Sequence, residues 1–331
     1  MLRAFAFVFA AFVGGTRAAK VPRCTLGVSG PDVSCIAFGT LHLHEAGSAA
    51  NVLTALQAVV AQGITTIDTS DVYNSMPELL GAALQLQPGL REQIEIVAKM
   101  DIVHGLNLNA GIFGFDTSDL YDSSCAHLKM TLQTRYLVPL NTSYVDVLML
   151  HHQDYLLDID AFAECMIELT AAGSVRHVGV SNFDRDMFAA LNKRVPLVAN
   201  EIEVSVLNPK AIYDGTVSAM YNLGASILAW GPVGGDGYGG ANRLFKVGSI
   251  DDSKRTPRIR AGLTAIGAQL GVTPDVVAVA WLLRHPANII PIIGTMDPNH
   301  LSNQSQAFLV AQNMTAAQWY YVADAAQVPV W

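Results

Sequence analysis

Residues 65–84, TTIDTSDVYNSMPELLGAAL, place a short apolar strand, a polar loop and the start of an amphipathic helix in direct succession. Asp68 lies at the end of the strand, and Tyr73 follows five residues later, before the helix begins. In α/β folds, catalytic and binding side chains are found on the loops that follow parallel strands. The stretch therefore predicts one β-α unit with reactive side chains at the carboxyl end of its strand.

The same unit recurs along the chain, because short β-like runs alternate with amphipathic helical runs such as 49–63, 160–173 and 273–286. Gly63 and Gly173 are plausible C-terminal stops for two of these helices. Eight strands are expected, at CIAFGT (35–40), ITTIDT (64–69), IEIVAK (94–99), VDVLMLH (145–151), RHVGVS (176–181), LVANEI (197–202), SILAW (226–230) and IIPIIG (289–294). No GxGxxG motif follows the first strand, so the sequence predicts a single (β/α)8 TIM barrel rather than an open sheet.

Length and composition agree with one such domain. A barrel of about 250 to 300 residues would use nearly all of the 331 residues. With 51% hydrophobic and 15% charged residues, the chain is too apolar for disorder, yet it has too few long apolar runs for a membrane bundle. The net charge of −8 and the absence of a basic block disfavour nucleic acid and anionic membranes as partners.

Two segments are longer than ordinary connections. Residues 101–123 follow the third expected strand and residues 231–247 follow the seventh, and both are rich in Gly, Asp and aromatic residues. Long loops in compact domains usually carry function, and these two belong to the carboxyl face of the barrel.

The amino terminus resembles a secretory leader. In residues 1–18, Arg3 precedes an apolar run that ends near Thr16-Arg17-Ala18 and is too short to span a bilayer. A hydrophobic first strand is the alternative. The barrel domain is assigned to residues 22–331, and N-glycosylation patterns at Asn141, Asn303 and Asn313 are compatible with export. We expect the secretory pathway or an organelle if the leader is cleaved, and the cytoplasm otherwise; the sequence predicts no oligomeric state.

The four cysteines, Cys24, Cys35, Cys125 and Cys165, form no CxxC or Cys/His set, so no zinc site is expected. A hairpin over residues 24–37, turning near Gly30-Pro31, would place Cys24 diagonal to Cys35. Because that geometry is poor for a disulfide, all four are expected to be free thiols.

Four polar residues fall at or just after the ends of successive strands: Asp68, Tyr73, Lys99 and His151. In this order and spacing they resemble the Asp, Tyr, Lys and His tetrad of the aldo-keto reductases. The resemblance covers about residues 22–325 and continues through GSVRHVGVSNF (173–183), ANEIEVS (199–205), AWGPVGG (229–235) and PIIGT (291–295). It implies an NAD(P)H-dependent oxidoreductase that reduces an aldehyde or ketone to an alcohol.

The tetrad also makes chemical sense by itself. Carbonyl reduction needs a proton for the oxygen, and a phenol with a pKa near its reference value of about 10 is a slow acid at neutral pH. A buried Lys99 ammonium, held by Asp68, would favour the Tyr73 phenolate and lower its pKa. His151 could donate a hydrogen bond to the same substrate oxygen.

Each residue alone has an ordinary structural explanation, such as a loop cap, a half-buried aromatic, a solvated lysine or a core histidine. Their convergence on one face of the barrel favours catalysis. A metal hydrolase is the less favoured alternative: His151 and His152 are adjacent in sequence, and neighbouring strand residues point to opposite sides, so only His42 and His44 could add ligands. No metal is expected.

The resemblance further implies a cofactor site. Ser181, Asn182 and Glu201 would hold the nicotinamide amide, and Trp230 would stack on its ring, although a core aromatic is the alternative for Trp230. The glycine-rich loop 231–235 would approach the pyrophosphate. The full expected set is Gly39, Thr40, Ser181, Asn182, Glu201, Trp230, Gly231, Pro232, Val233, Gly235, Gly294, Thr295, Asp297 and His300.

The chain departs from the family pattern at three places. Glu201 replaces the usual Gln, and it can donate a hydrogen bond only when protonated. Asn74 replaces the usual Gly after the catalytic Tyr, a mild change because Asn tolerates a left-handed backbone. Asp297 and His300 occupy positions where relatives carry Lys or Arg for the NADPH 2′-phosphate. NADP(H) is thus the family default, with NAD(H) possible because an acidic residue suits ribose hydroxyls.

A second function is compatible with the same resemblance, namely a catalytically weak, cofactor-sensing regulatory subunit of the same fold. Turnover of a generic aldehyde would distinguish the enzyme from the sensor. Expected pocket walls include Leu41, His42 and Tyr155, but the sequence does not predict which carbonyl compound they accept.

Overall fold

The structure, a computed structural model, describes residues 19–104, 119–234, 244–245 and 255–329. Its centre is a closed barrel of parallel strands in the order β10-β11-β12-β3-β4-β5-β8-β9. The strands are β3 (Ala37–Gly39), β4 (Thr66–Ser70), β5 (Glu95–Met100), β8 (Val145–Leu150), β9 (Val175–Ser181), β10 (Leu197–Glu203), β11 (Ser226–Trp230) and β12 (Ile289–Ile293). Each overlaps one of the eight expected strands, and the (β/α)8 prediction is confirmed.

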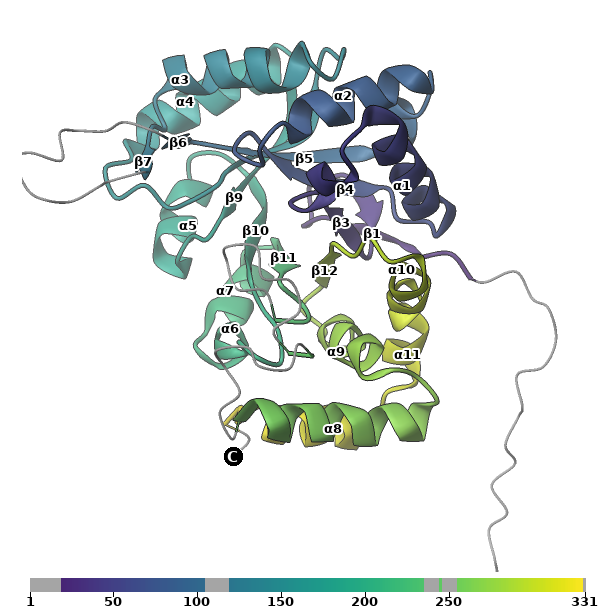
Figure 1. Cartoon of the computed structure of the whole chain (residues 1–331). Coiled ribbons are helices and arrows are strands. Elements are labelled where there is room, and N and C mark those ends of the chain that lie inside the picture. The colour runs from purple at the N-terminus through teal and green to yellow at the C-terminus, as the bar shows by residue number, and fades with distance from the viewer. Residues whose placement is uncertain (1–18, 105–118, 235–243, 246–254, 330–331) are drawn as a thin grey trace, which may run out of the picture.

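Helices surround the barrel (Figure 1). The three helices with expected bounds, α1, α4 and α9, begin and end close to them. Gly63 and Gly173 follow α1 and α4 with left-handed φ values of 85° and 76°, as helix stops require. The helices are α1 (Ala49–Ala61), α2 (Met76–Leu86), α3 (Cys125–Thr131), α4 (Ile159–Ala171), α5 (Arg185–Asn192), α6 (Lys210–Tyr213), α7 (Thr216–Asn222), α8 (Arg255–Leu270), α9 (Pro274–Leu283), α10 (Pro298–Ser305), α11 (Ala307–Asn313) and α12 (Ala316–Ala325), with short helical turns η1 (Leu43–Ala46), η2 (Arg91–Gln93) and η3 (Leu132–Leu137).

Two apolar cores hold the barrel together. The larger lies between strands and helices, and the smaller joins residues of several strands to Leu26 and Val33 of the amino-terminal hairpin. This hairpin pairs β1 (Arg23–Thr25) with antiparallel β2 (Asp32–Ser34), directly before β3. Side chains therefore fill the barrel interior, and the polar residues of interest lie at the carboxyl ends of the strands.

The expectation of free thiols is wrong, because the cysteines form two disulfides, Cys24–Cys35 and Cys125–Cys165. In the hairpin register Cys24 faces Val33, and β2 ends at Ser34. Cys35 is therefore diagonal to Cys24, as expected, and its nitrogen donates to the Pro22 carbonyl at 2.9 Å. The two Cα atoms are nevertheless only 5.1 Å apart, which is within the range of a disulfide. The second bridge joins α3 to α4 at a Cα separation of 5.5 Å.

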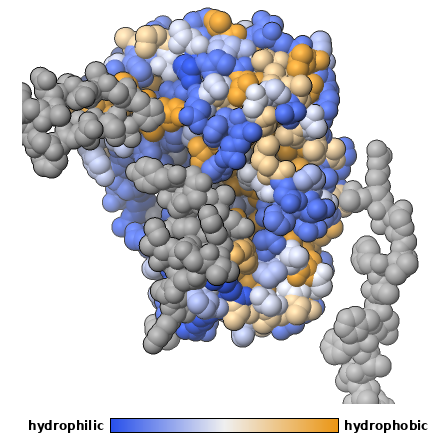
Figure 2. Space-filling view, in the orientation of Figure 1, coloured by the Kyte–Doolittle hydropathy of each residue, from blue (hydrophilic) through white to orange (hydrophobic). Residues whose placement is uncertain are grey.

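The first long segment starts and ends as an antiparallel pair, β6 (Ile102–His104) with β7 (Asp119–Tyr121). Residues 105–118 between them, and most of the second segment, 231–247, lie outside the described residues, as do residues 1–18. Hydrophilic and hydrophobic residues are interspersed over the described part of the face in Figure 2. In the described ranges no single helix has the length and apolar character of a membrane span, although the bent pair α8 and α9 would pass jointly.

Candidate active site

A buried ammonium lies at the centre of the candidate site. Lys99 on β5 is 1% exposed, and its Nζ lies 2.6 Å from Asp68 Oδ1 on the neighbouring strand β4. Glu201 Oε1 lies 2.5 Å from the same nitrogen. Glu201 belongs to β10, which is not adjacent to β5 in the barrel order, so this contact spans the barrel interior.

Burial alone would lower the pKa of Lys99, but the charges of Asp68 and Glu201 raise it well above its ordinary value. Burial, and next the charge of Asp68, raise the pKa of Glu201 to about 8, against the opposing effect of Lys99. Glu201 is therefore mainly a neutral acid at neutral pH. Its second oxygen, Oε2, is buried and has no hydrogen-bond partner among the described residues.

Tyr73 lies in the loop between β4 and α2, with the centre of its ring 5.3 Å from Lys99 Nζ. The next residue, Asn74, adopts a left-handed φ of 50°, which Asn tolerates at a position where Gly would otherwise be used. The sequence therefore predicted correctly that Asn is accommodated after Tyr73.

The predicted lowering of the Tyr73 pKa is wrong on balance. Burial raises the pKa of Tyr73 above its ordinary value, the Lys99 ammonium lowers it, and the carboxylates of Asp68 and Glu201 raise it. The ammonium acts in the predicted direction, but the burial of Tyr73 outweighs it. Tyr73 thus remains a protonated phenol in the protein by itself.

His151 faces Tyr73 edge to face, with ring centres 5.8 Å apart and planes at 77°. It does not point away from His152: the two rings stack at 5.2 Å and 22°. The expectation of opposite sides is wrong because β8 ends at Leu150, so the two-residue alternation of a strand no longer applies. Among the described residues no group of His, Cys, Asp or Glu could hold a metal ion.

The sequence interpretation missed Ser70, whose Oγ lies 2.9 Å from His151 Nδ1 and 3.1 Å from Asp71 Oδ1. Because the Asp71 carboxylate can only accept, the single Ser70 proton is donated to Asp71 Oδ1, and His151 Nδ1 donates to Ser70 Oγ. Ser70 is two residues after Asp68 on the same strand, and residues i and i+2 share a face. That spacing was the signal that could have identified Ser70.

Asp101 was missed in the same way, two residues after Lys99. It is fully buried with a left-handed φ of 117°, and its Oδ1 has no hydrogen-bond partner in the described chain. Burial raises the pKa of the Asp101 carboxyl well above its ordinary value. Asp101 Oδ2 also accepts from the His152 nitrogen at 3.5 Å. A buried carboxyl with a strained backbone therefore lies directly after β5, beside the histidine pair.

The side chain of Asn182 connects residues that are expected to hold the nicotinamide. Its Nδ2 donates to the His151 carbonyl at 3.0 Å, and its Oδ1 accepts from Trp230 Nε1 at 3.1 Å. Ser181 Oγ donates to the Glu201 carbonyl at 3.0 Å. These side chains hold β8, β9, β10 and β11 together at their carboxyl ends, and the half-buried Trp230 ring is fixed in place by Asn182.

Other expected cofactor residues also lie at carboxyl ends of strands. Thr40 follows β3, and its buried Oγ1 has no partner among the described residues. A Cβ on Gly39 would lie 3.0 Å from Ile292 Cγ2, and one on Gly294 would lie 3.4 Å from the Gly39 carbonyl. Gly231 has a left-handed φ of 63° and begins a tight turn with Gly234 that includes Pro232 and Val233, whereas Gly235 lies outside the described residues.

Asp297 caps helix α10. Its Oδ1 accepts from the backbone nitrogens of Asn299 at 2.7 Å and His300 at 3.2 Å, and Thr295 Oγ1 accepts from the Asp297 nitrogen at 3.2 Å. The backbone N–H groups of His300 and Asn299 hold the pKa of Asp297 below its usual value. A carboxylate therefore already occupies the anion position at this helix terminus.

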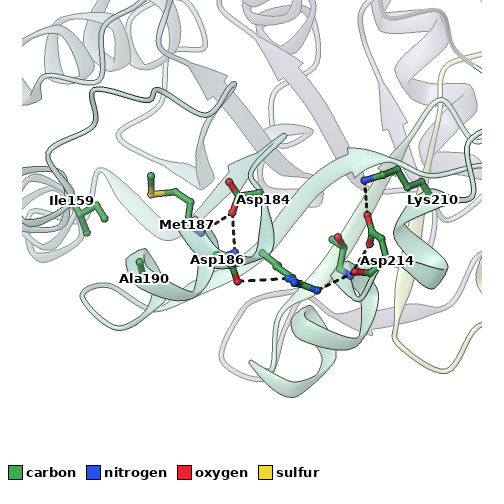
Figure 3. Close-up of a pocket in the computed structure, with 9 residues that line it drawn as sticks. Ile159, Asp184, Asp186, Met187, Ala190, Lys210 and Asp214 are labelled. Atoms are coloured by element: carbon green, nitrogen blue, oxygen red, sulfur yellow. Dashed lines mark hydrogen bonds and ion pairs between the residues drawn. The ribbon is translucent and has the colours of Figure 1, made fainter.

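A surface depression of about 650 Å³ lies elsewhere, between α5 and the α6–α7 segment (Figure 3). Its charged residues pair with each other, as Lys210 with Asp214 at 2.9 Å and Arg185 with Asp186 at 3.6 Å. None of the residues around Lys99 lines it, so it is separate from the candidate site. Its lining residues are Ile159, Asp184, Arg185, Asp186, Met187, Ala190, Lys210, Asp214 and Thr216.

A family model described as the Aldo/keto reductase family matches residues 35–326. The chain belongs to this family. Among aldo/keto reductases, it is 33% identical to a 6-dehydroglucose reductase of Agrobacterium fabrum over 87% of this chain and 93% of the relative. It is 31% identical to oxidoreductase YdhF of Escherichia coli over 92% of this chain and 98% of the relative.

The fold is likewise that of solved aldo/keto reductases. The holo form of aldo-keto reductase AKR11C1 from Bacillus halodurans superposes with a TM-score of 0.76 at 21% identity, covering 94% of this chain and 98% of that one. The sequence-based recognition is thereby confirmed. This aldo/keto reductase is an oxidoreductase of the NAD(P)H-dependent, carbonyl-reducing type.

Proposed function

We propose that this aldo/keto reductase reduces an aldehyde or ketone with Tyr73 as the general acid. The observation that carries the proposal is the buried cluster in which Lys99 bridges Asp68 and Glu201 next to the Tyr73 ring. A fixed cation beside a phenol is the arrangement that stabilises the phenolate left behind when the proton moves to the substrate.

When bound, the reduced nicotinamide cofactor would supply one hydride, that is, a proton with two electrons, to the carbonyl carbon. Tyr73 would give its proton to the carbonyl oxygen. The C=O group then becomes CH–OH, and Tyr73 becomes a phenolate. Because its pKa is raised, Tyr73 holds the proton until that oxygen acquires alkoxide character. His151, whose ring lies edge to face with that of Tyr73, would donate from Nε2 to the same oxygen in its doubly protonated form and stabilise the developing charge.

The residues present fit a nicotinamide cofactor. The unpaired Glu201 Oε2 and Thr40 Oγ1 are buried polar atoms at the carboxyl end of the barrel, where a ligand could satisfy them. Glu201 would contact the carboxamide, Trp230 would stack on the ring, and the backbone of the Gly231 turn would lie near the pyrophosphate.

Glu201 should make the relative affinity for the oxidised and the reduced form of the cofactor depend on pH. Its pKa of about 8 means that it is neutral below pH 8 and anionic above, whereas the pKa values of Lys99 and Tyr73 are raised out of this range. A buried anion favours the cationic oxidised ring over the neutral reduced ring. We expect the Kd of the oxidised cofactor, relative to that of the reduced cofactor, to fall about tenfold between pH 7 and 9.

The matched variant is Glu201→Gln, which keeps the shape and an oxygen for Lys99 but does not titrate. Its ratio of dissociation constants should stay flat over the same pH range in equilibrium titrations of both cofactor forms. An equally steep ratio in the variant would assign the titration to another group and refute the role of Glu201.

Asp297 should disfavour NADPH, because its carboxylate occupies the N-terminus of α10 where the 2′-phosphate would need backbone donors. In Asp297→Ser the hydroxyl retains a cap without the charge. We expect the KM for NADPH to fall about fivefold, with little change for NADH. Steady-state kinetics with both cofactors measure this.

Asp158→Ser is the control, because Asp158 caps α4 through Ala161 in the same manner and the same charge is removed. An unchanged NADPH KM in Asp297→Ser, or an equal drop in Asp158→Ser, would contradict the assignment.

The substrate proposal is tested with a panel that contains a nitrobenzaldehyde and 6-dehydroglucose, the compound for which the relative from Agrobacterium fabrum is named. Steady oxidation of NADPH or NADH supports the reductase. Tight cofactor binding without turnover on any carbonyl would favour the sensor instead.

We further propose that the chain is exported, with residues 1–18 as the leader. The two disulfides support this, because disulfides persist in oxidising compartments and are rare where thiols are kept reduced. All four cysteines of the chain are paired. The sequence of the mature amino terminus tests the proposal, and a retained Met1 would refute it.

A further inference from the structure

We propose that Asn141, in the sequence Asn141-Thr142-Ser143, carries an N-linked glycan. The turn that holds it joins η3 to β8. The inference rests on the proposed export, because the acceptor sequence is used only along the secretory route. It concerns a surface far from the catalytic cluster, and none of the comparisons assigns it.

The local geometry presents Asn141 to solvent. The residue is exposed with a left-handed φ of 48°, and its backbone nitrogen donates to the Val138 carbonyl at 3.1 Å, which holds the turn in place. Its carboxamide makes no hydrogen bond with the described residues, so a sugar on Nδ2 would displace nothing. Ser143, the third residue of the acceptor sequence, is exposed as well.

In each of the other two acceptor sequences, residues take part in the hydrogen bonding of the fold. Asn313 is exposed, but its Nδ2 donates to the Leu309 carbonyl at 2.8 Å, and Thr315 caps α12. Asn303 is exposed within α10, but Ser305, its third residue, is fully buried and bonds Gln62 at 3.1 Å. Of the three, Asn141 is the one whose own side chain makes no described hydrogen bond and whose third residue is also exposed.

The position also leaves catalysis undisturbed. Asn141 precedes the amino end of β8, whereas His151 follows the carboxyl end of the same strand. A glycan therefore projects from the face of the barrel opposite the active site, which serves stability rather than chemistry. It would lie beside Val138, an apolar side chain that is 63% exposed in the same turn.

The test uses the full chain expressed in a eukaryotic secretory host, with intact mass measured before and after treatment with peptide N-glycosidase. Replacing Asn141 itself would place another side chain at a positive φ and strain the turn. Ser143→Ala instead destroys the acceptor sequence and keeps Asn141, while Ser143→Thr preserves the acceptor sequence as a matched control.

We expect the wild type and Ser143→Thr to lose the mass of one glycan on enzyme treatment, and Ser143→Ala to show no such loss, with reductase activity equal in all three. Edman sequencing of the same samples separates the two proposals. An unglycosylated chain that lacks its leader overturns the glycan alone. An unglycosylated chain that retains Met1 overturns both the glycan and the export. If Ser143→Ala loses the same glycan mass as the wild type, the sugar is attached elsewhere and the assignment to Asn141 is wrong.

Discussion

Replacing Tyr73 by Phe is expected to lower kcat for carbonyl reduction by about 10²- to 10⁴-fold, the usual contribution of a general acid. The change removes one oxygen and leaves the ring, which packs against the core and lies 5.3 Å from Lys99 Nζ. The fold and the cofactor site should therefore persist. Steady-state rates, together with the Kd of the reduced cofactor, separate loss of the proton donor from loss of binding.

Tyr221→Phe is the matched control, since Tyr221 is 65% exposed on α7 and loses the same hydroxyl. It should retain most of its kcat. If Tyr73→Phe kept wild-type turnover, another group would have to protonate the substrate oxygen, and the assignment of Tyr73 would fail.

The strands could be predicted because their pattern is local. Each barrel strand is a short run of apolar residues between turn signals, and IEIVAK or VDVLML is apolar on both faces because a parallel barrel buries both. The tetrad positions followed from the same pattern, since parallel strands end on one face of a barrel. Asp68 and Lys99 meet at 2.6 Å because β4 and β5 are neighbours in register.

The features that were predicted wrongly depend on where a strand ends or on contacts between distant parts of the chain. His152 stacks on His151 because β8 stops one residue before them, and a strand end is known only to within a few residues from sequence. The second disulfide joins cysteines 40 residues apart on two packed helices, and no local pattern encodes that contact.

The pKa values of the site residues depend on which side chains meet inside the barrel. The resemblance assigned Glu201 to the cofactor, but its Oε1 binds Lys99 from across the barrel. Burial raises the pKa of Tyr73, and the nearby carboxyls of Asp68 and Glu201 add to this, although Lys99 acts to lower it. Only the three-dimensional arrangement reveals this competition.

Replacing Lys99 by Met should affect both stability and catalysis. The variant leaves Asp68 and Glu201 buried, at 3% and 2% exposure, without their shared cation. Breaking a buried ion pair on one side costs about 3–5 kcal/mol, whereas Lys129→Met, which breaks the exposed pair with Glu168, should cost about 1 kcal/mol or less. Denaturant unfolding of the two variants measures the difference.

The deficit of Lys99→Met should also grow with pH. A buried carboxyl whose folded pKa is raised, as that of Glu201 already is, adds stability below its unfolded pKa and loses it as pH rises through the folded pKa. Without the ammonium the pKa of Glu201 is raised further, because Lys99 opposes that shift in the wild type. The loss of unfolding free energy should thus be smaller at pH 5 than at pH 8, and a deficit that does not change with pH would contradict this account.

Adding Asp68→Asn and Glu201→Gln to Lys99→Met replaces both carboxyls left without their cation by amides of nearly the same shape. We expect this triple variant to recover most of the lost stability, since neutral amides can be buried where unpaired carboxylates cannot. It should nevertheless remain inactive, because no cation is left to stabilise the Tyr73 phenolate. Recovery of turnover together with stability would mean that Lys99 only supports the fold, and the proposed proton transfer would then have to proceed without it.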